Sequence, residues 1–105
     1  MPPRQESPVA LITGGAKRVG AQIARTLHAA GYDLALHCRR SVAEAAELAA
    51  ELEALRPGST LILQAELAEL DALHALVDTT LARYRRLDAL VNNASAFYPT
   101  PVGNA

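Results

Sequence analysis

Glycines and cations follow the first apolar run of this sequence in a pattern that suits an anion. The stretch Thr13-Gly14-Gly15-Ala16-Lys17-Arg18-Val19-Gly20 stands between that run and a helix-like segment. Glycine permits tight turns and close backbone approach, and a helix N-terminus offers unpaired N–H groups and a positive dipole end. Lys17 and Arg18 would oppose that dipole unless an anion lay beside them. The pattern predicts a phosphate-binding loop that includes Gly14, Lys17, Arg18, Val19 and Gly20; a tight turn that binds nothing is the alternative.

A second basic segment, His37-Cys38-Arg39-Arg40-Ser41, follows the second apolar run and contains no acid. Dinucleotide-binding units that take NAD usually carry Asp or Glu at this place to bind the ribose hydroxyl, and Asp33 comes too early for that role. Guanidinium groups and a hydroxyl supply the positive charge and donors that a 2′-phosphate requires. The segment therefore predicts NADP(H) as the cofactor. The alternative is that both arginines are solvated loop charges and Ser41 only caps a helix.

Short apolar runs alternate with helix-period segments along the rest of the chain. The runs predict buried strands over 9–13, 34–38, 60–63 and 87–91. Helices are predicted over 19–30, over 41–55 with Ser41 as the N-cap, and through a third segment that starts near residue 70. The predicted inner faces of these helices carry Val19, Ile23 and Leu27, then Leu48, Leu52 and Leu55, then Leu70, Leu73, Val77, Leu81 and Tyr84.

This β-α-β-α-β-α-β order requires parallel strands with helical crossovers, so the predicted fold is an α/β doubly wound parallel sheet of the Rossmann type. In that fold the first and fourth strands are neighbours, and later strands cover the fourth. An apolar parallel strand is rarely left as an edge. Residues 8–105 are therefore expected to be the N-terminal part of a single dinucleotide-binding domain that is incomplete, and residues 1–7 a flexible tail.

Composition excludes several classes of function. The net charge of −1 gives no general attraction to nucleic acid, and no apolar run is long enough to cross a membrane. The single cysteine, Cys38, favours a reducing compartment and a cytoplasmic location.

Several other residues give no sign of a site of their own. His28 and His74 lack partners at metal-ligand spacing, so we expect surface or half-buried histidines and no metal site. The phosphate loop lacks the Gly-Lys-Ser/Thr of a P-loop, which argues against a kinase or ATPase. Glutamates are expected to form the solvated face of the second helix, at Glu44, Glu47, Glu51 and Glu53.

The quoted segments resemble the short-chain dehydrogenase/reductase family. Its two N-terminal signatures are Thr-Gly-x-x-x-x-x-Gly at the first turn and Asn-Asn-Ala after the fourth strand, here Asn92-Asn93-Ala94. Within that family the sequence is most similar to pteridine reductases, which share the Thr-Gly-x-Ala-Lys-Arg-x-Gly loop, the segment His37-x-x-Arg40-Ser41, and the stretch 92–101. Ser95 stands where members of the wider family usually carry glycine. Arg18 stands at another position where many members of that family carry glycine.

The resemblance implies an NADPH-dependent reductase that transfers hydride to a pterin, dihydropterin or folate-like ring, in a homo-oligomer that is commonly a tetramer. It places Arg18 near the cofactor pyrophosphate and the pterin, Ser95 against cofactor and substrate, and Phe97 in a stack with the pterin. Further cofactor contacts are implied for His37, Arg39, Arg40, Ser41, Glu66, Leu67, Asn93, Ala94 and Ser95.

Two departures from the family pattern bear on these expectations. Glu66 stands where family members usually have the Asp that meets the adenine, and the catalytic Tyr-x-x-x-Lys is absent, so no catalytic residue is assigned within this chain. The alternatives are a carbonyl or 3-oxoacyl reductase on the same scaffold, and a non-catalytic NADP-binding module if the chain ends at residue 105.

Overall fold

Seven elements alternate along the residues that the computed structural model describes, which are 7–14, 18–66 and 70–93. The strands are β1 (Val9–Thr13), β2 (Asp33–Cys38), β3 (Thr60–Gln64) and β4 (Ala89–Asn92), and the helices are α1 (Arg18–Ala29), α2 (Val42–Leu55) and α3 (Leu70–Tyr84). The predicted order is confirmed, with small shifts at the ends. Several predicted site residues lie outside the described residues, namely Lys17, Leu67, Ala94, Ser95 and Phe97, as does the predicted tail apart from Ser7.

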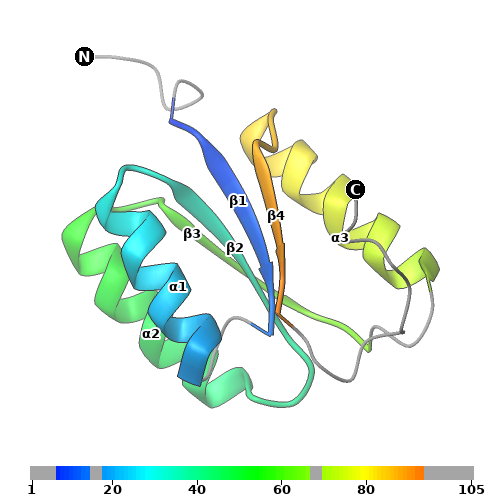
Figure 1. Ribbon diagram of the computed structural model, residues 1–105, viewed down its shortest axis with the longest axis horizontal. Helices are drawn as coiled ribbons and strands as arrows, with labels where there is room; N and C mark the ends of the chain where they lie inside the picture. Colours follow the sequence, from blue (N-terminus) through cyan, green and yellow to red (C-terminus); the bar gives the residue numbers. More distant parts are fainter. Residues whose placement is uncertain (1–6, 15–17, 67–69, 94–105) are drawn as a thin grey trace.

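The strands form one parallel sheet in the order β3-β2-β1-β4 (Figure 1). Leu11 of β1 is opposite Ala35 of β2 on one side and Leu90 of β4 on the other. This arrangement confirms the predicted doubly wound sheet and the predicted pairing of the first and fourth strands. The central strands β1 and β2 are buried throughout, whereas β3 and β4 are only partly buried because each has one neighbour.

Helices cover both faces of the sheet, with α1 and α2 on one face and α3 on the other (Figure 1). Since side chains alternate along a strand, Ile12 and Leu36 pack toward α1 and α2, while Leu11 and Ala35 pack toward α3. The core is thus two apolar layers separated by the sheet. No helix within the described ranges is long and apolar enough to cross a bilayer.

Small residues line the part of α1 that lies closest to the sheet. Val19 was predicted on the inner face but is 63% exposed, so that prediction was wrong, whereas Ile23 and Leu27 do pack partly against the core. Small side chains allow the helix backbone to approach the strands closely, which displaces larger residues to the flanks. The buried residues of α1 are Gly20, Ala21, Ala24 and His28.

The inner faces of the other helices follow the predicted period except near helix ends. Leu48 and Leu52 of α2 are buried as predicted, but Leu55, the last residue of that helix, is 73% exposed, so its predicted inward position was wrong. In α3, Leu73 and Tyr84 are buried, while Leu81, predicted to face inward, is exposed. Thr80, one position before Leu81, is buried instead. Val77 is partly buried against the core as predicted, next to the buried Leu76.

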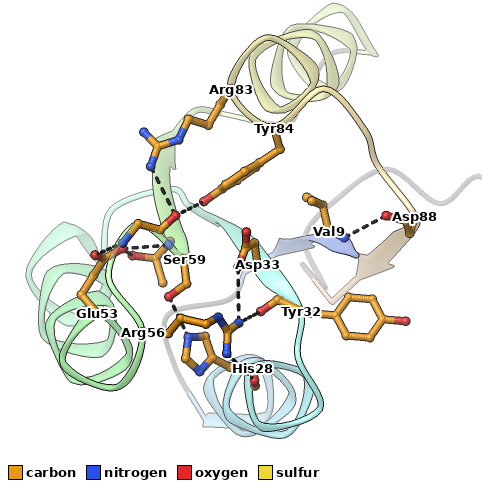
Figure 2. Close-up of polar contacts among 12 residues, drawn as sticks. Val9, His28, Tyr32, Asp33, Glu53, Arg56, Ser59, Arg83, Tyr84 and Asp88 are labelled. Atoms are coloured by element: carbon orange, nitrogen blue, oxygen red, sulfur yellow. Dashed lines mark hydrogen bonds and ion pairs between the residues drawn. The ribbon is translucent and has the colours of Figure 1, made fainter. Parts of the chain in front are cut away.

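A polar network closes the edge of the sheet at which the strands begin (Figure 2). Arg56, which follows α2, donates to the backbone oxygen of Tyr32 and lies 3.3 Å from Oδ1 of the fully buried Asp33. His28 Nε2 lies 2.7 Å from Ser59 Oγ. His28 is only 2% exposed, which corrects the prediction of a surface or half-buried histidine. The serine hydroxyl makes this burial possible because it satisfies the ring nitrogen.

Glu53 joins the end of α2 to the start of β3. Its carboxylate accepts the N–H groups of Gly58 at 2.7 Å and Thr60 at 2.9 Å, and the Thr60 hydroxyl at 2.7 Å. Glu53 was predicted to be one of four solvated glutamates; the other three are exposed, and this one is half-buried. The turn supplies three donors to its carboxylate, which explains the difference.

Candidate cofactor-binding site

Those predicted site residues that the structure describes come together at the edge of the sheet at which the parallel strands end. β1 lies between β2 and β4, and the connections that follow β1 and β3 lead to helices on opposite faces (Figure 1). Ligands of doubly wound sheets bind at such a switch point, outside the carboxyl ends of the strands. Gly14 follows β1, Arg39 follows β2, and Asn93 follows β4 at this edge. The candidate site is therefore built from chain segments that are far apart in the sequence.

The described part of the phosphate loop is Gly14 together with the first turn of α1. Gly14 has a φ of 64°, a left-handed conformation that favours glycine. The helix starts at Arg18, its first turn carries no acidic residue, and Gly20 is buried against the sheet. Arg18 and Val19 are exposed there. A helix whose first turn carries an exposed arginine and no acidic residue fits an anion such as a pyrophosphate at its N-terminus.

Asn93 ties the loop to the end of β4. Its backbone N–H donates to Thr13 Oγ1 at 2.9 Å, and its side-chain amide donates to the backbone oxygen of Gly14 at 3.1 Å. Thr13 Oγ1 also lies 3.1 Å from Asn92 Oδ1. Thr13 is fully buried, and sequence reasoning did not include it among the site residues. Its place as the polar last residue of an otherwise apolar strand was the signal available.

His37 lies in β2, directly beside the loop. Gly14 N–H donates to His37 Nδ1 at 3.0 Å, and His37 Nε2 lies 2.8 Å from the backbone oxygen of Ala65. The ring is 2% exposed, and this burial lowers the pKa of His37, although the Ala65 carbonyl and the Glu66 carboxylate oppose the shift. The predicted site residue His37 is thus an internal link between three strand ends.

The basic segment after β2 is exposed and holds one ion pair. Arg39 Nε donates to Glu66 Oε2 at 2.7 Å, which brings together two residues predicted separately to bind the cofactor. Arg40 is exposed beside them. Ser41 stands at the N-cap position of α2, where its backbone oxygen accepts the Ala45 N–H, but its side chain makes no capping hydrogen bond. The hydroxyl that was expected to cap the helix is therefore not used for that purpose.

The residues that follow β2 offer donors and positive charge to an anionic group. Two guanidinium groups and a hydroxyl follow β2, and the acid of that strand, Asp33, is buried at the opposite edge beside Arg56. Cys38 is buried at the end of β2, and burial raises the pKa of its thiol, which disfavours the reactive thiolate form.

Comparison with known proteins identifies the class to which this scaffold belongs. The chain matches the family described as short chain dehydrogenase over residues 8–104. It therefore belongs to the short-chain dehydrogenase/reductase family, whose members are oxidoreductases that bind nicotinamide cofactors. The doubly wound sheet and the glycine loop after β1 agree with that membership.

Similar individual proteins include three reductases. Pteridine reductase 1 of Leishmania tarentolae is 45% identical over 91% of this chain and 39% of its own length. A putative ketoacyl reductase 2 of granaticin polyketide synthase from Streptomyces violaceoruber is 39% identical over 85% of this chain and 34% of its own length. A 3-oxoacyl-(acyl-carrier-protein) reductase of Synechocystis sp. is 36% identical over 82% and 34%, respectively. The chain thus spans well under half the length of these relatives.

Proposed function

We propose that this chain is the cofactor-binding part of an NADPH-dependent reductase that transfers hydride to a pterin, dihydropterin or folate-like ring. One observation carries the cofactor assignment. The end of β2 is followed by Arg39, Arg40 and Ser41, whose hydroxyl makes no capping hydrogen bond. The acidic residue of this strand, Asp33, lies at its other end. Such a set of donors favours a phosphate on the adenosine ribose over a free hydroxyl.

The residues of this chain bind and orient the cofactor, and NADPH supplies the hydride when bound. Arg18 and the start of α1 are proposed to hold the pyrophosphate, and Arg40 and Ser41 the 2′-phosphate. Arg39 is shared with Glu66, so its charge is partly neutralised before any cofactor arrives. Glu66 is proposed to lie near the adenine through its position after β3.

The pterin assignment is supported by the likeness to pteridine reductase 1 over most of this chain. It is further supported by the sequence 92–101, in which Ser95 and Phe97 are proposed to contact the substrate. A planar heteroaromatic ring gains buried area and stacking energy from an aromatic wall. The 3-oxoacyl reductases among the relatives provide the competing assignment.

The cofactor proposal is tested by Arg40→Ala in the complete polypeptide that carries this sequence. We expect the Kd for NADPH to rise about tenfold to a hundredfold, since a charge-assisted contact to phosphate is lost. The Kd for NADH should stay nearly constant. Arg25→Ala provides a matched surface control, because Arg25 is an exposed arginine paired with Glu51 on the outer side of α1. Equal loss of both dinucleotides, or none, would refute the assignment.

The substrate proposal is tested by following NADPH oxidation with dihydropterins and, in parallel, with 3-oxoacyl thioesters. Turnover of dihydropterins alone supports the pterin assignment. Turnover of thioesters alone replaces it with the 3-oxoacyl assignment. NADPH binding with no turnover of either class would favour the non-catalytic module.

A further inference from the structure

The imidazole of His37 occupies an unusual place among the strand ends. It is 2% exposed and lies between the first residue after β1 and the first residue after β3. A buried imidazole needs partners for both nitrogens, because an unsatisfied one costs free energy. Here both partners are backbone groups, from positions 23 and 28 residues away in the sequence.

These partners define the protonation state of the ring. Gly14 N–H is a donor, so Nδ1, 3.0 Å away, must accept and carries no proton. The Ala65 carbonyl is an acceptor, so Nε2, 2.8 Å away, must carry the proton and donate it. His37 is therefore held as the neutral Nε2-H tautomer. Neither nitrogen is left to donate to a phosphate.

Both backbone polar groups of Gly14, its N–H and its carbonyl, are held by hydrogen bonds to side chains. Its N–H is bound by His37, and its carbonyl accepts the side-chain amide of Asn93 at 3.1 Å. The four groups Asn93, Gly14, His37 and Ala65 form a continuous chain of hydrogen bonds across the ends of β4, β1, β2 and β3. Gly14 is the first glycine of the phosphate loop, and its φ of 64° is a left-handed conformation that favours glycine.

We propose that His37 is a positioning residue for the cofactor, which acts by holding Gly14 in the conformation that the phosphate loop requires. This inference rests on the proposed dinucleotide-binding function. It differs from the direct cofactor contact that the sequence resemblance implies for His37. The positioning role requires an acceptor at the Nδ1 position. The donor at Nε2 only bonds the Ala65 carbonyl after β3.

Two substitutions test the hydrogen bonds of Nδ1 and Nε2 one at a time. His37→Asn places an amide oxygen close to the position of Nδ1 and keeps an acceptor for Gly14, but loses the bond to Ala65. His37→Gln places its amide near the position of Nε2 and keeps a donor for Ala65, but leaves Gly14 N–H without its acceptor. Each variant loses one hydrogen bond and the ring, so both should lower the melting temperature by similar amounts.

We expect the Kd for NADPH, measured by isothermal titration in the complete polypeptide, to rise about tenfold in His37→Gln and to stay within about threefold of wild type in His37→Asn. The tenfold figure corresponds to the loss of one buried hydrogen bond. Equal weakening by both variants, or stronger weakening by His37→Asn, would overturn the inference and leave His37 as part of the core only.

Two measurements without cofactor keep this test separate from the proposed function. Nitrogen-15 NMR of wild-type His37 should show Nδ1 unprotonated and Nε2 protonated at neutral pH, and hydrogen exchange of the Gly14 amide should be slow in wild type and His37→Asn but fast in His37→Gln. A protonated Nδ1 or an unprotected Gly14 amide in wild type would refute the positioning role even if NADPH binds. If these signatures hold and wild type binds no dinucleotide, the proposed function fails instead.

Discussion

At the scale of single residues, Arg18 combines an unfavourable backbone conformation with a place in the candidate site. It starts α1 with a φ of 49°, in the left-handed region that a side chain makes costly by roughly 1–2 kcal/mol. Strain at the start of this helix supports the proposal that the Arg18 guanidinium binds the cofactor pyrophosphate.

Arg18→Gly should therefore separate stability from cofactor binding. Relief of strain is partly offset by the greater flexibility of glycine in the unfolded chain, so the free energy of unfolding should be unchanged or rise by up to about 1 kcal/mol. The affinity for NADPH should fall about tenfold. Chemical denaturation and isothermal titration measure the two quantities.

Gln22→Gly provides the control for Arg18→Gly within the same helix. Gln22 is exposed in the interior of α1, where glycine should lower the free energy of unfolding by about 1 kcal/mol. A comparable loss in Arg18→Gly would contradict the view that Arg18 is strained.

At the scale of elements, Arg56 joins three segments that begin or end at the amino edge of the sheet (Figure 2). Its backbone N–H donates to the backbone oxygen of Leu52 and closes α2. Its guanidinium donates to the backbone oxygens of His28 and Tyr32 and to Asp33. Positive charge at the end of α1 also suits the negative end of that helix dipole. Asp33 is fully buried, so loss of Arg56 would leave its carboxylate without this compensating charge.

Arg56→Ala is expected to lower the free energy of unfolding by about 2–4 kcal/mol, measured by urea denaturation. The matched control is Arg25→Ala, which removes an arginine–carboxylate pair whose side chains are both 46% exposed. That loss should be about 0.5 kcal/mol or less, because exposed pairs contribute little. Similar losses for the two variants would show that burial of Asp33 does not matter.

Glu53 provides a second element-scale test, at the turn between α2 and β3. Glu53→Ala removes the acceptor of three hydrogen bonds from Gly58 and Thr60, and should cost about 1–3 kcal/mol of unfolding free energy. Glu47→Ala on the exposed side of the same helix should change it by about 0.5 kcal/mol or less. If Glu53→Ala were as mild as Glu47→Ala, the carboxylate would not be holding the turn.

At the scale of the whole molecule, the titrating groups make the stability of the fold depend on pH in two steps. Burial lowers the pKa of His28 and His37 from 6.5, so acid protonates these groups more readily in the unfolded chain than in the folded one. The stabilisation of the folded state that these two histidines contribute is complete above pH 6.5 and is lost as the pH falls toward their lowered pKa values.

The second step in stability comes from carboxylates with lowered pKa values. Hydrogen bonds from Thr60 lower the pKa of Glu53 from 4.5, and hydrogen bonds from Arg86 and from Val9 N–H lower that of Asp88 from 3.8 to about 2.

We therefore expect the melting temperature to fall with acidification first below pH 6.5 and again below about pH 4.5, with the second step extending to about pH 2. Thermal denaturation between pH 8 and pH 2 measures both steps. Replacing both His28 and His37 with glutamine should remove the upper step, while His74→Gln, at an exposed position, should keep it. Persistence of the upper step without the two buried histidines would contradict this explanation.

Much of the fold could be predicted because its signals are local. Apolar runs that end at glycine or asparagine mark β1 and β4, and Pro57-Gly58 marks the break before β3. Alternation of strands and helices then leaves few topologies, which is why the neighbouring of β1 and β4 was predicted correctly. Helix faces were less predictable. Periodicity marks an apolar stripe, but the distance between helix and sheet decided that Gly20 and Ala24 are buried while Val19 is exposed.

The sequence by itself determined the order of elements, the glycine loop after the first strand and the absence of an acid after the second, since each depends on residue types within a few positions. The tertiary structure alone decided which polar groups meet: His37 with Gly14 and Ala65, Arg39 with Glu66, and Arg56 with Asp33. These contacts join residues 23 to 28 positions apart. They exist because the parallel crossovers bring successive strand ends to one edge of the sheet and successive strand starts to the other. Buried polar atoms such as those of His37 and Asp33 find their partners there.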